Sequence, residues 1–89
     1  MNEEGEEIVT LQPNEQVLKV CLETKHRAGK TVTLVLGFIG KNEDLEVLGK
    51  KLRNTCGAGG SAKDGEIILQ GDQREKAAAW LKKNNYQVK

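Results

Sequence analysis

The stretch Gly57-Ala-Gly-Gly-Ser-Ala-Lys-Asp-Gly65, continued by Glu66-Ile-Ile-Leu-Gln-Gly-Asp72, decides how the C-terminal half of this 89-residue chain folds. Four of the chain's ten glycines fall between Gly57 and Gly65, with one lysine among them. A loop of this composition either cradles an anion or makes a turn that only glycine permits. The elements on each side of the stretch distinguish these two interpretations.

After the glycines, residues 66–70 have the alternation of a short strand, with Ile67 and Leu69 on one face. Asp72 is placed to cap a helix, and Glu75 three residues later predicts a capping box. This helix should continue to about Lys83, before Asn84 and Asn85. Residues 86–89 then predict a final edge strand.

Before the glycines, a helix is predicted from about Glu43 to about Cys56, with acids in its first turns and bases near its end. One apolar stripe at helical spacing comprises Leu45, Leu48, Leu52 and Cys56. Gly57 suits a left-handed end to this helix. The glycine-rich stretch therefore connects a helix to a strand, and is not a phosphate loop between a strand and a helix.

Two strands are predicted in the N-terminal half, at residues 17–23 and 31–38. In the second strand, Val32, Leu34, Leu36 and Phe38 share one face. The short connection at residues 24–30 contains Gly29 and predicts an antiparallel hairpin. The fold class expected is α+β, a two-layer sandwich. Its sheet is mixed, mostly antiparallel, with about four to five strands and two helices packed on one face.

The net charge of +1 conceals an asymmetry. Residues 1–16 carry five acids and no Lys or Arg, whereas residues 17–89 carry 14 basic side chains against eight acids. We expect a flexible acidic tail at residues 1–14, ending near Pro13, and one domain at residues 15–89. A basic domain hints at a polyanionic partner, although an acidic tail that maintains solubility explains the pattern equally well. No apolar run has the roughly 18 residues of a membrane span, so a cytoplasmic protein is expected.

No enzymatic site is predicted. His26 is the only histidine and has no acidic neighbour in sequence, so neither a catalytic group nor a metal site can be assembled around it. Cys21 and Cys56 are expected to be unpaired. Residues 24–31 end in Gly-Lys-Thr like a phosphate-binding P-loop, but Thr24 stands where that motif needs glycine and the loop joins two strands. We expect no cofactor and no metal.

Two basic surfaces are candidates for contact with RNA phosphates. The hairpin tip presents Lys25, Arg27 and Lys30, with His26 as a further cation at lower pH. The first helix presents Lys50, Lys51 and Arg53, to which Lys63 adds a charge. The hairpin residues are equally compatible with a solubilising tip, and an ordinary solvated helix face is the usual explanation of the second set. With three aromatic residues in the chain, base stacking on the sheet is not expected, and any RNA contact should be to phosphates and shape.

Four segments then resemble a known family in order and spacing: Arg27-Ala-Gly-Lys-Thr-Val-Thr33, Leu48-Gly-Lys-Lys-Leu-Arg53, Gly57 to Gly65, and Ile68-Leu-Gln-Gly-Asp-Gln-Arg74. They resemble eukaryotic translation initiation factor 1 and its short prokaryotic relatives. The likeness covers residues 17–85, and the chain is most similar to a stand-alone prokaryotic member.

The resemblance implies binding to the small ribosomal subunit and its ribosomal RNA, with initiator tRNA and mRNA as indirect partners, and an influence on start-codon selection and initiation fidelity. A monomer is the default expectation, and no contact with a membrane is expected. The RNA- and ribosome-binding residues that the resemblance implies are Lys25, Arg27, Gly29, Lys30, Lys50, Lys51, Arg53, Lys63 and Asp64. His26, where this hairpin departs from the family, is also included as a candidate. Two alternatives remain open: a general RNA-binding regulator of translation without a start-codon role, and a protein-interaction module that keeps only the fold.

Overall fold

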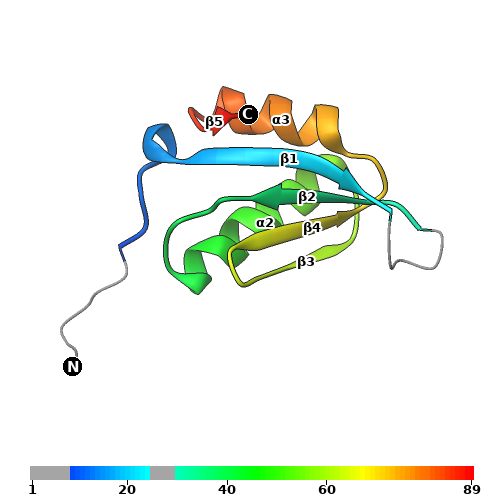
Figure 1. The fold of residues 1–89 in the computed structure, drawn as a ribbon, viewed down its shortest axis with the longest axis horizontal. Helices are drawn as coiled ribbons and strands as arrows, with labels where there is room; N and C mark the ends of the chain where they lie inside the picture. The colour runs from blue at the N-terminus through cyan, green and yellow to red at the C-terminus, as the bar shows by residue number, and fades with distance from the viewer. Residues whose placement is uncertain (1–8, 25–29) are drawn as a thin grey trace.

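The computed structural model of the chain describes residues 9–24 and 30–89. In chain order the elements are η1 (Pro13–Glu15), β1 (Val17–Glu23), β2 (Val32–Leu36), α2 (Asn42–Cys56), β3 (Gly60–Lys63), β4 (Glu66–Gln70), α3 (Arg74–Lys83) and β5 (Gln87–Val88). The five strands form one sheet in the order β3-β4-β2-β1-β5. Neighbouring strands are antiparallel, except that β5 lies parallel to β1. The sheet and its two helices, shown in Figure 1, confirm the predicted α+β class.

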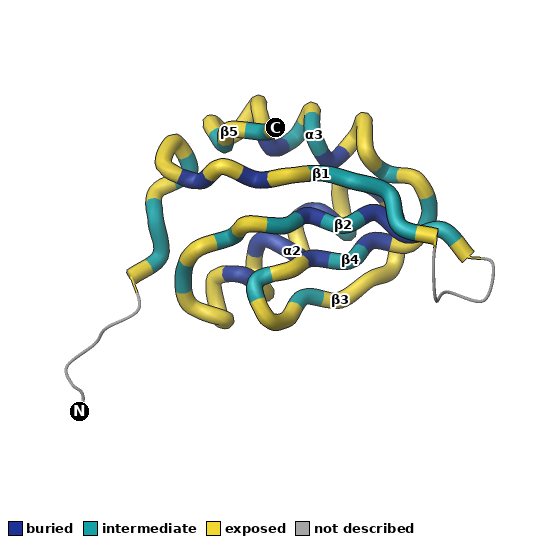
Figure 2. The backbone as a smooth tube through the Cα atoms, in the orientation of Figure 1, coloured by how far each residue is buried: buried dark blue, intermediate teal, exposed yellow. Residues whose placement is uncertain are grey.

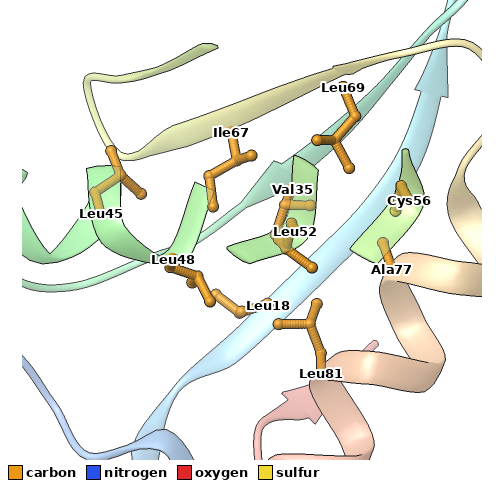
Figure 3. Close-up of a cluster of buried hydrophobic side chains, with 10 residues drawn as sticks. All are labelled: Leu18, Val35, Leu45, Leu48, Leu52, Cys56, Ile67, Leu69, Ala77 and Leu81. Atoms are coloured by element: carbon orange, nitrogen blue, oxygen red, sulfur yellow. The ribbon is translucent and has the colours of Figure 1, made fainter. Parts of the chain in front are cut away.

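The core lies between the sheet and the two helices (Figure 3). The predicted stripe of α2 is confirmed, because Leu45, Leu48, Leu52 and Cys56 are all buried. They meet inward residues of the sheet and of α3, namely Leu18, Val35, Ile67, Leu69, Ala77 and Leu81. Figure 2 shows this buried layer along the strands and the inner side of α2.

Strand β2 turns a different face to the core than its apolar residues suggest. Its leucines, Leu34 and Leu36, are only partly buried, whereas Thr33 and Val35 are fully buried. The register of β2 with its neighbours determines which face is buried, because Val35 lies opposite Val20 on one side and Ile67 on the other. Leu34 lies opposite Cys21 and Ile68, so these three side chains occupy the sheet face away from the helices.

The expectation that residues 57–65 form only a loop is wrong in part, because Gly60–Lys63 is an edge strand paired with β4. A Cβ on Gly60 would lie 1.9 Å from the Ile68 carbonyl oxygen, which is far inside van der Waals contact. Gly60 is therefore required by close backbone approach in a pleated pair and not by a positive φ. Positive φ occurs instead at Gly57 (64°) and Gly65 (77°), where the chain leaves α2 and turns from β3 to β4.

The predicted capping of the second helix is also wrong. Helix α3 begins at Arg74 after an N-cap at Gln73, and no side chain caps it. Asp72, the residue expected as the cap, accepts hydrogen bonds from the Arg74 side chain and, at 3.3 Å, from the Arg74 N–H. Buried Thr33 on β2 binds the start of α3 instead. The other boundaries agree closely with expectation: α2 begins one residue earlier than predicted, and Gly57 ends it in the left-handed conformation.

The segment before β1 is joined to the domain. Leu11 N–H donates to the Ile39 carbonyl over 3.2 Å. The buried Gln16 side chain exchanges hydrogen bonds with the backbone of Ile39, at 2.9 and 3.0 Å, and donates to the Leu11 carbonyl. These bonds lie partly within the segment expected to be flexible as far as Pro13; the division into a tail at 1–14 and a domain at 15–89 stays a prediction.

Candidate nucleic-acid interface

The hairpin predicted to carry the strongest basic site is described only at its base. Lys25, His26, Arg27 and Gly29 lie outside the described residues, while Lys30 is exposed beside the start of β2. The strands that hold the loop pair from Lys19 with Leu36 to Glu23 with Val32, which confirms the antiparallel hairpin. The Thr31 carbonyl accepts a hydrogen bond from Gly71 N–H at 2.8 Å. The base of the hairpin is therefore joined to the turn that leads into α3.

The start of α3 brings a second set of charges to this end of the sheet (Figure 1). Arg74 donates from Nε and Nη2 to the two carboxylate oxygens of Asp72, each over 2.9 Å. These hydrogen bonds lower the pKa of Asp72 below its usual range and raise that of Arg74. Both side chains are half exposed, so the pair adds little to stability but holds the guanidinium in one orientation.

Lys76, on the first turn of α3, approaches the C-terminal end of α2. Burial raises the pKa of the Cys56 thiol, and the positive charge of Lys76 partly offsets this effect. We did not predict Arg74 or Lys76 as site residues. No local sequence signal marks them, because it is the pairing of β2 with both β1 and β4 that places the hairpin base and the end of β4 at the same end of the sheet.

The three basic residues of α2 do not share one surface. Successive helical residues are turned by about 100°, so Lys50 and Arg53 lie on one flank and Lys51 on the other. Arg53 Nη1 donates to the Gly60 carbonyl at 3.1 Å, on the side of the edge strand β3. Lys51 borders a hollow with Asp44, Val47 and Tyr86 on the opposite flank. Lys50 and Lys51 are exposed, whereas Arg53 is partly buried.

Lys63 and Asp64 lie at the far end of the sheet from the hairpin. They form the turn from β3 to β4, in which Asp64 (φ 54°) and Gly65 (φ 77°) both adopt the left-handed region. Ala62 faces α2, since a Cβ on Gly49 would lie 3.0 Å from the Ala62 Cβ. Lys63, the next residue of the strand, therefore points to the other sheet face. The structure therefore places Lys63 at the opposite end of the sheet from the hairpin base.

Residues 9–24 and 30–89 contain no group of three or more His, Cys, Asp or Glu side chains that could hold a metal ion. Cys21 and Cys56 are both free thiols there, the first half-buried and the second buried. No helix among these residues is sufficiently long and apolar for a transmembrane segment. The described aromatic pair, Trp80 and Tyr86, stacks with ring centroids 6.3 Å apart and packs against the core.

Comparison with known proteins gives a consistent result. Residues 14–87 match the sequence profile of the family described as translation initiation factor SUI1. A protein translation factor SUI1 homolog of Picrophilus torridus is 43% identical over 76 residues, which cover 84% of this chain and 76% of that protein. The homolog of Methanocaldococcus jannaschii is 44% identical over 72 residues, covering 81% and 69%. An uncharacterized protein of Synechocystis is 39% identical over 85 residues, covering 96% and 77%.

Proposed function

Because this chain belongs to the translation initiation factor SUI1 family, we propose that it binds the small ribosomal subunit and influences which start codons are accepted. The observation that carries this proposal is the family match across nearly the whole described domain. The proposed protein is a cytoplasmic monomer that makes and breaks no covalent bond and uses no cofactor. Its effect would come from occupying the subunit where codon and anticodon are matched.

The charge distribution supports contact with RNA phosphates. Residues 17–89 carry 14 basic side chains against eight acids. Lys30 at the base of the hairpin and Lys50 and Lys51 on α2 are exposed and are available to a polyanion. Each neutralised phosphate releases counterions, so affinity for RNA should fall steeply as salt rises. We include Lys25, His26, Arg27 and Gly29 of the hairpin in this proposed interface.

The remaining residues of the proposed interface carry different roles. Arg53 is held by the Gly60 carbonyl, so its guanidinium is oriented before any partner binds. Lys63 and Asp64 lie at the opposite end of the sheet from the hairpin. If both ends touch the ribosome, they touch separate places, and the protein spans them along the sheet. Such a rigid two-point contact favours recognition by shape as well as by charge.

Cosedimentation with purified small subunits at several salt concentrations tests this function. We expect binding that weakens steeply with salt, and a further loss for the double variant Arg27→Glu/Lys30→Glu. The matched control is Lys82→Glu/Lys83→Glu, which makes the same charge change at two exposed lysines at the other end of α3. A reporter comparing AUG with near-cognate start codons then separates start-codon selection from general RNA binding. Salt-independent or absent binding would overturn the proposal.

A further inference from the structure

The chain enters the described part of the structure beside the N-terminal end of α2 (Figure 1). Lys41 N–H donates to Thr10 Oγ1 over 2.9 Å, and the Thr10 hydroxyl donates to the Asp44 carboxylate. Gly40 packs against Thr10 so closely that a Cβ on this glycine would lie 2.7 Å from the Thr10 Cα. The described chain is thus fixed to the start of α2 at Thr10, two residues after the segment 1–8 ends.

The exposed side of α2 presents an apolar residue followed by positive charge. Val47 is 53% exposed and is the large apolar residue of this side of the helix. The next turn presents exposed Lys50 and Lys51, three and four residues on. A shallow hollow of about 330 Å³ runs beside this stripe, bordered by Thr10, Val47 and Lys51. The hollow therefore begins at the attachment point and leads to Lys51, whereas Lys50 lies on the other flank of the exposed side.

Residues 1–8 have the complementary chemistry. They contain Glu3, Glu4, Glu6 and Glu7, no Lys or Arg, and end in the apolar Ile8. Four extended residues span about 13 Å, whereas the seven residues from Asp44 to Lys51 rise about 10 Å along the helix. The acids of the segment can therefore reach both lysines while Ile8 is level with Val47. Glu43, Asp44 and Glu46 are exposed on the first turns of α2 and repel these acids toward the lysines further along the helix.

We propose that residues 1–8 bind along the exposed side of α2, with Ile8 against Val47 and the four glutamates beside Lys50 and Lys51. The N-terminal segment of the same chain then occupies this side of α2, and RNA phosphates must displace the segment before they can bind there. The segment acts as an intramolecular competitor that lowers affinity for any polyanion reaching α2. This regulatory role rests on the RNA binding proposed above, whereas the docking itself does not.

The docking is tested without RNA, by comparing backbone amide chemical shifts of the full chain with those of the variant Glu3→Gln/Glu4→Gln/Glu6→Gln/Glu7→Gln. We expect shift changes at Val47, Lys50 and Lys51 at low salt that disappear at high salt, where surface charges are screened. Lys82 and Lys83, which are exposed on α3, serve as the internal control and should not change. Absence of changes on α2, or equal changes on α3, would overturn the docking.

Competition is tested by a double-mutant cycle on small-subunit binding. Neutralising the four glutamates should raise affinity about five-fold, the value expected from a few weak surface ion pairs. The gain should vanish when Lys50→Gln/Lys51→Gln is already present. A gain that persists on this background reflects net charge alone and overturns the competition. If no variant binds the subunit, the competition and the proposed function both fail, while the amide shifts alone decide the docking.

Discussion

The hydroxyl of Thr33, in the centre of the sheet, accepts a 2.7 Å hydrogen bond from the backbone N–H of Gln73, the N-cap residue of α3. The same hydroxyl donates to the Gly71 carbonyl at 2.8 Å. Thr33 is fully buried, so its side chain satisfies two backbone groups that are shielded from water. A strand residue therefore fixes the start of a helix that comes 40 positions later.

Replacing Thr33 with valine should lower the free energy of unfolding by about 1–3 kcal/mol, because the variant keeps the shape but leaves Gln73 N–H and Gly71 C=O unpaired. Urea denaturation measures the loss. Thr33→Ser is the matched control, since it keeps the hydroxyl and removes one methyl group. Hydrogen exchange at the Gln73 amide should accelerate in the valine variant alone; equal protection in both variants would contradict this role of the hydroxyl.

The edge strand provides a second prediction, on glycine. Gly60→Ala should destabilise the domain more than Gly57→Ala does, and urea denaturation of both variants measures the difference. A methyl on Gly60 meets the Ile68 carbonyl oxygen, so the strands must separate, and such overpacking costs about 1–3 kcal/mol. A methyl on Gly57 meets nothing within 4 Å and bears only the cost of its left-handed backbone, about 1–2 kcal/mol. If Gly57→Ala were the more destabilising variant, the left-handed backbone at Gly57, and not the close approach of the strands at Gly60, would be the stronger requirement for glycine in this segment.

Local sequence patterns predicted the elements whose signals lie within themselves. The stripe Leu45, Leu48, Leu52 and Cys56 is confirmed as buried, and Gly57 ends α2 as expected. The helix α3 and the strand β4 are likewise where periodicity placed them, apart from the position of the N-cap. These patterns need no knowledge of the partner surface, because helical spacing or alternation marks which side turns inward.

The features that sequence did not predict depend on distant partners. Strand β3 consists of Gly60, Ser61, Ala62 and Lys63, which have low strand propensity, and it exists because β4 pairs with it. The inward face of β2 is set by register with its neighbours and not by its own leucines. In the candidate site, Arg53 of α2 bonds to the Gly60 carbonyl of β3, whereas Lys63, further along this strand, points to the other sheet face. No pattern within either element shows that contact.

The carboxylate of Asp72 supplies a prediction on pH. Hydrogen bonds from Arg74 lower the pKa of Asp72 below its usual value of 3.8, so the folded state favours the ionised form. The stabilising contribution is then present above about pH 4 and is lost as the pH falls through the lowered value. Carboxyl-detected NMR titration should give a midpoint below 3.8 for Asp72, rising toward 3.8 in Arg74→Gln. Identical midpoints in the two proteins would show that the pair does not persist in solution.

Arg53 and Lys50 lie on the same flank of α2, yet they should respond differently to removal. Arg53 Nη1 donates to the Gly60 carbonyl, and its side chain is partly buried between α2 and the sheet edge. Arg53→Ala should therefore lower the free energy of unfolding by about 0.5–1.5 kcal/mol, the net value of one hydrogen bond. Lys50 is exposed, so Lys50→Ala should change the stability by less than about 0.5 kcal/mol.

The two variants also separate structure from binding at the proposed interface. Both remove one positive charge, so each should weaken small-subunit binding and make it less sensitive to salt if both side chains meet phosphates. Urea denaturation and cosedimentation on the same preparations give the two quantities side by side. A loss of stability without a loss of binding in Arg53→Ala would assign this arginine to the β3 edge alone. Unchanged binding in Lys50→Ala would remove this flank of α2 from the interface, because Lys50 has no comparable structural role to hide the effect.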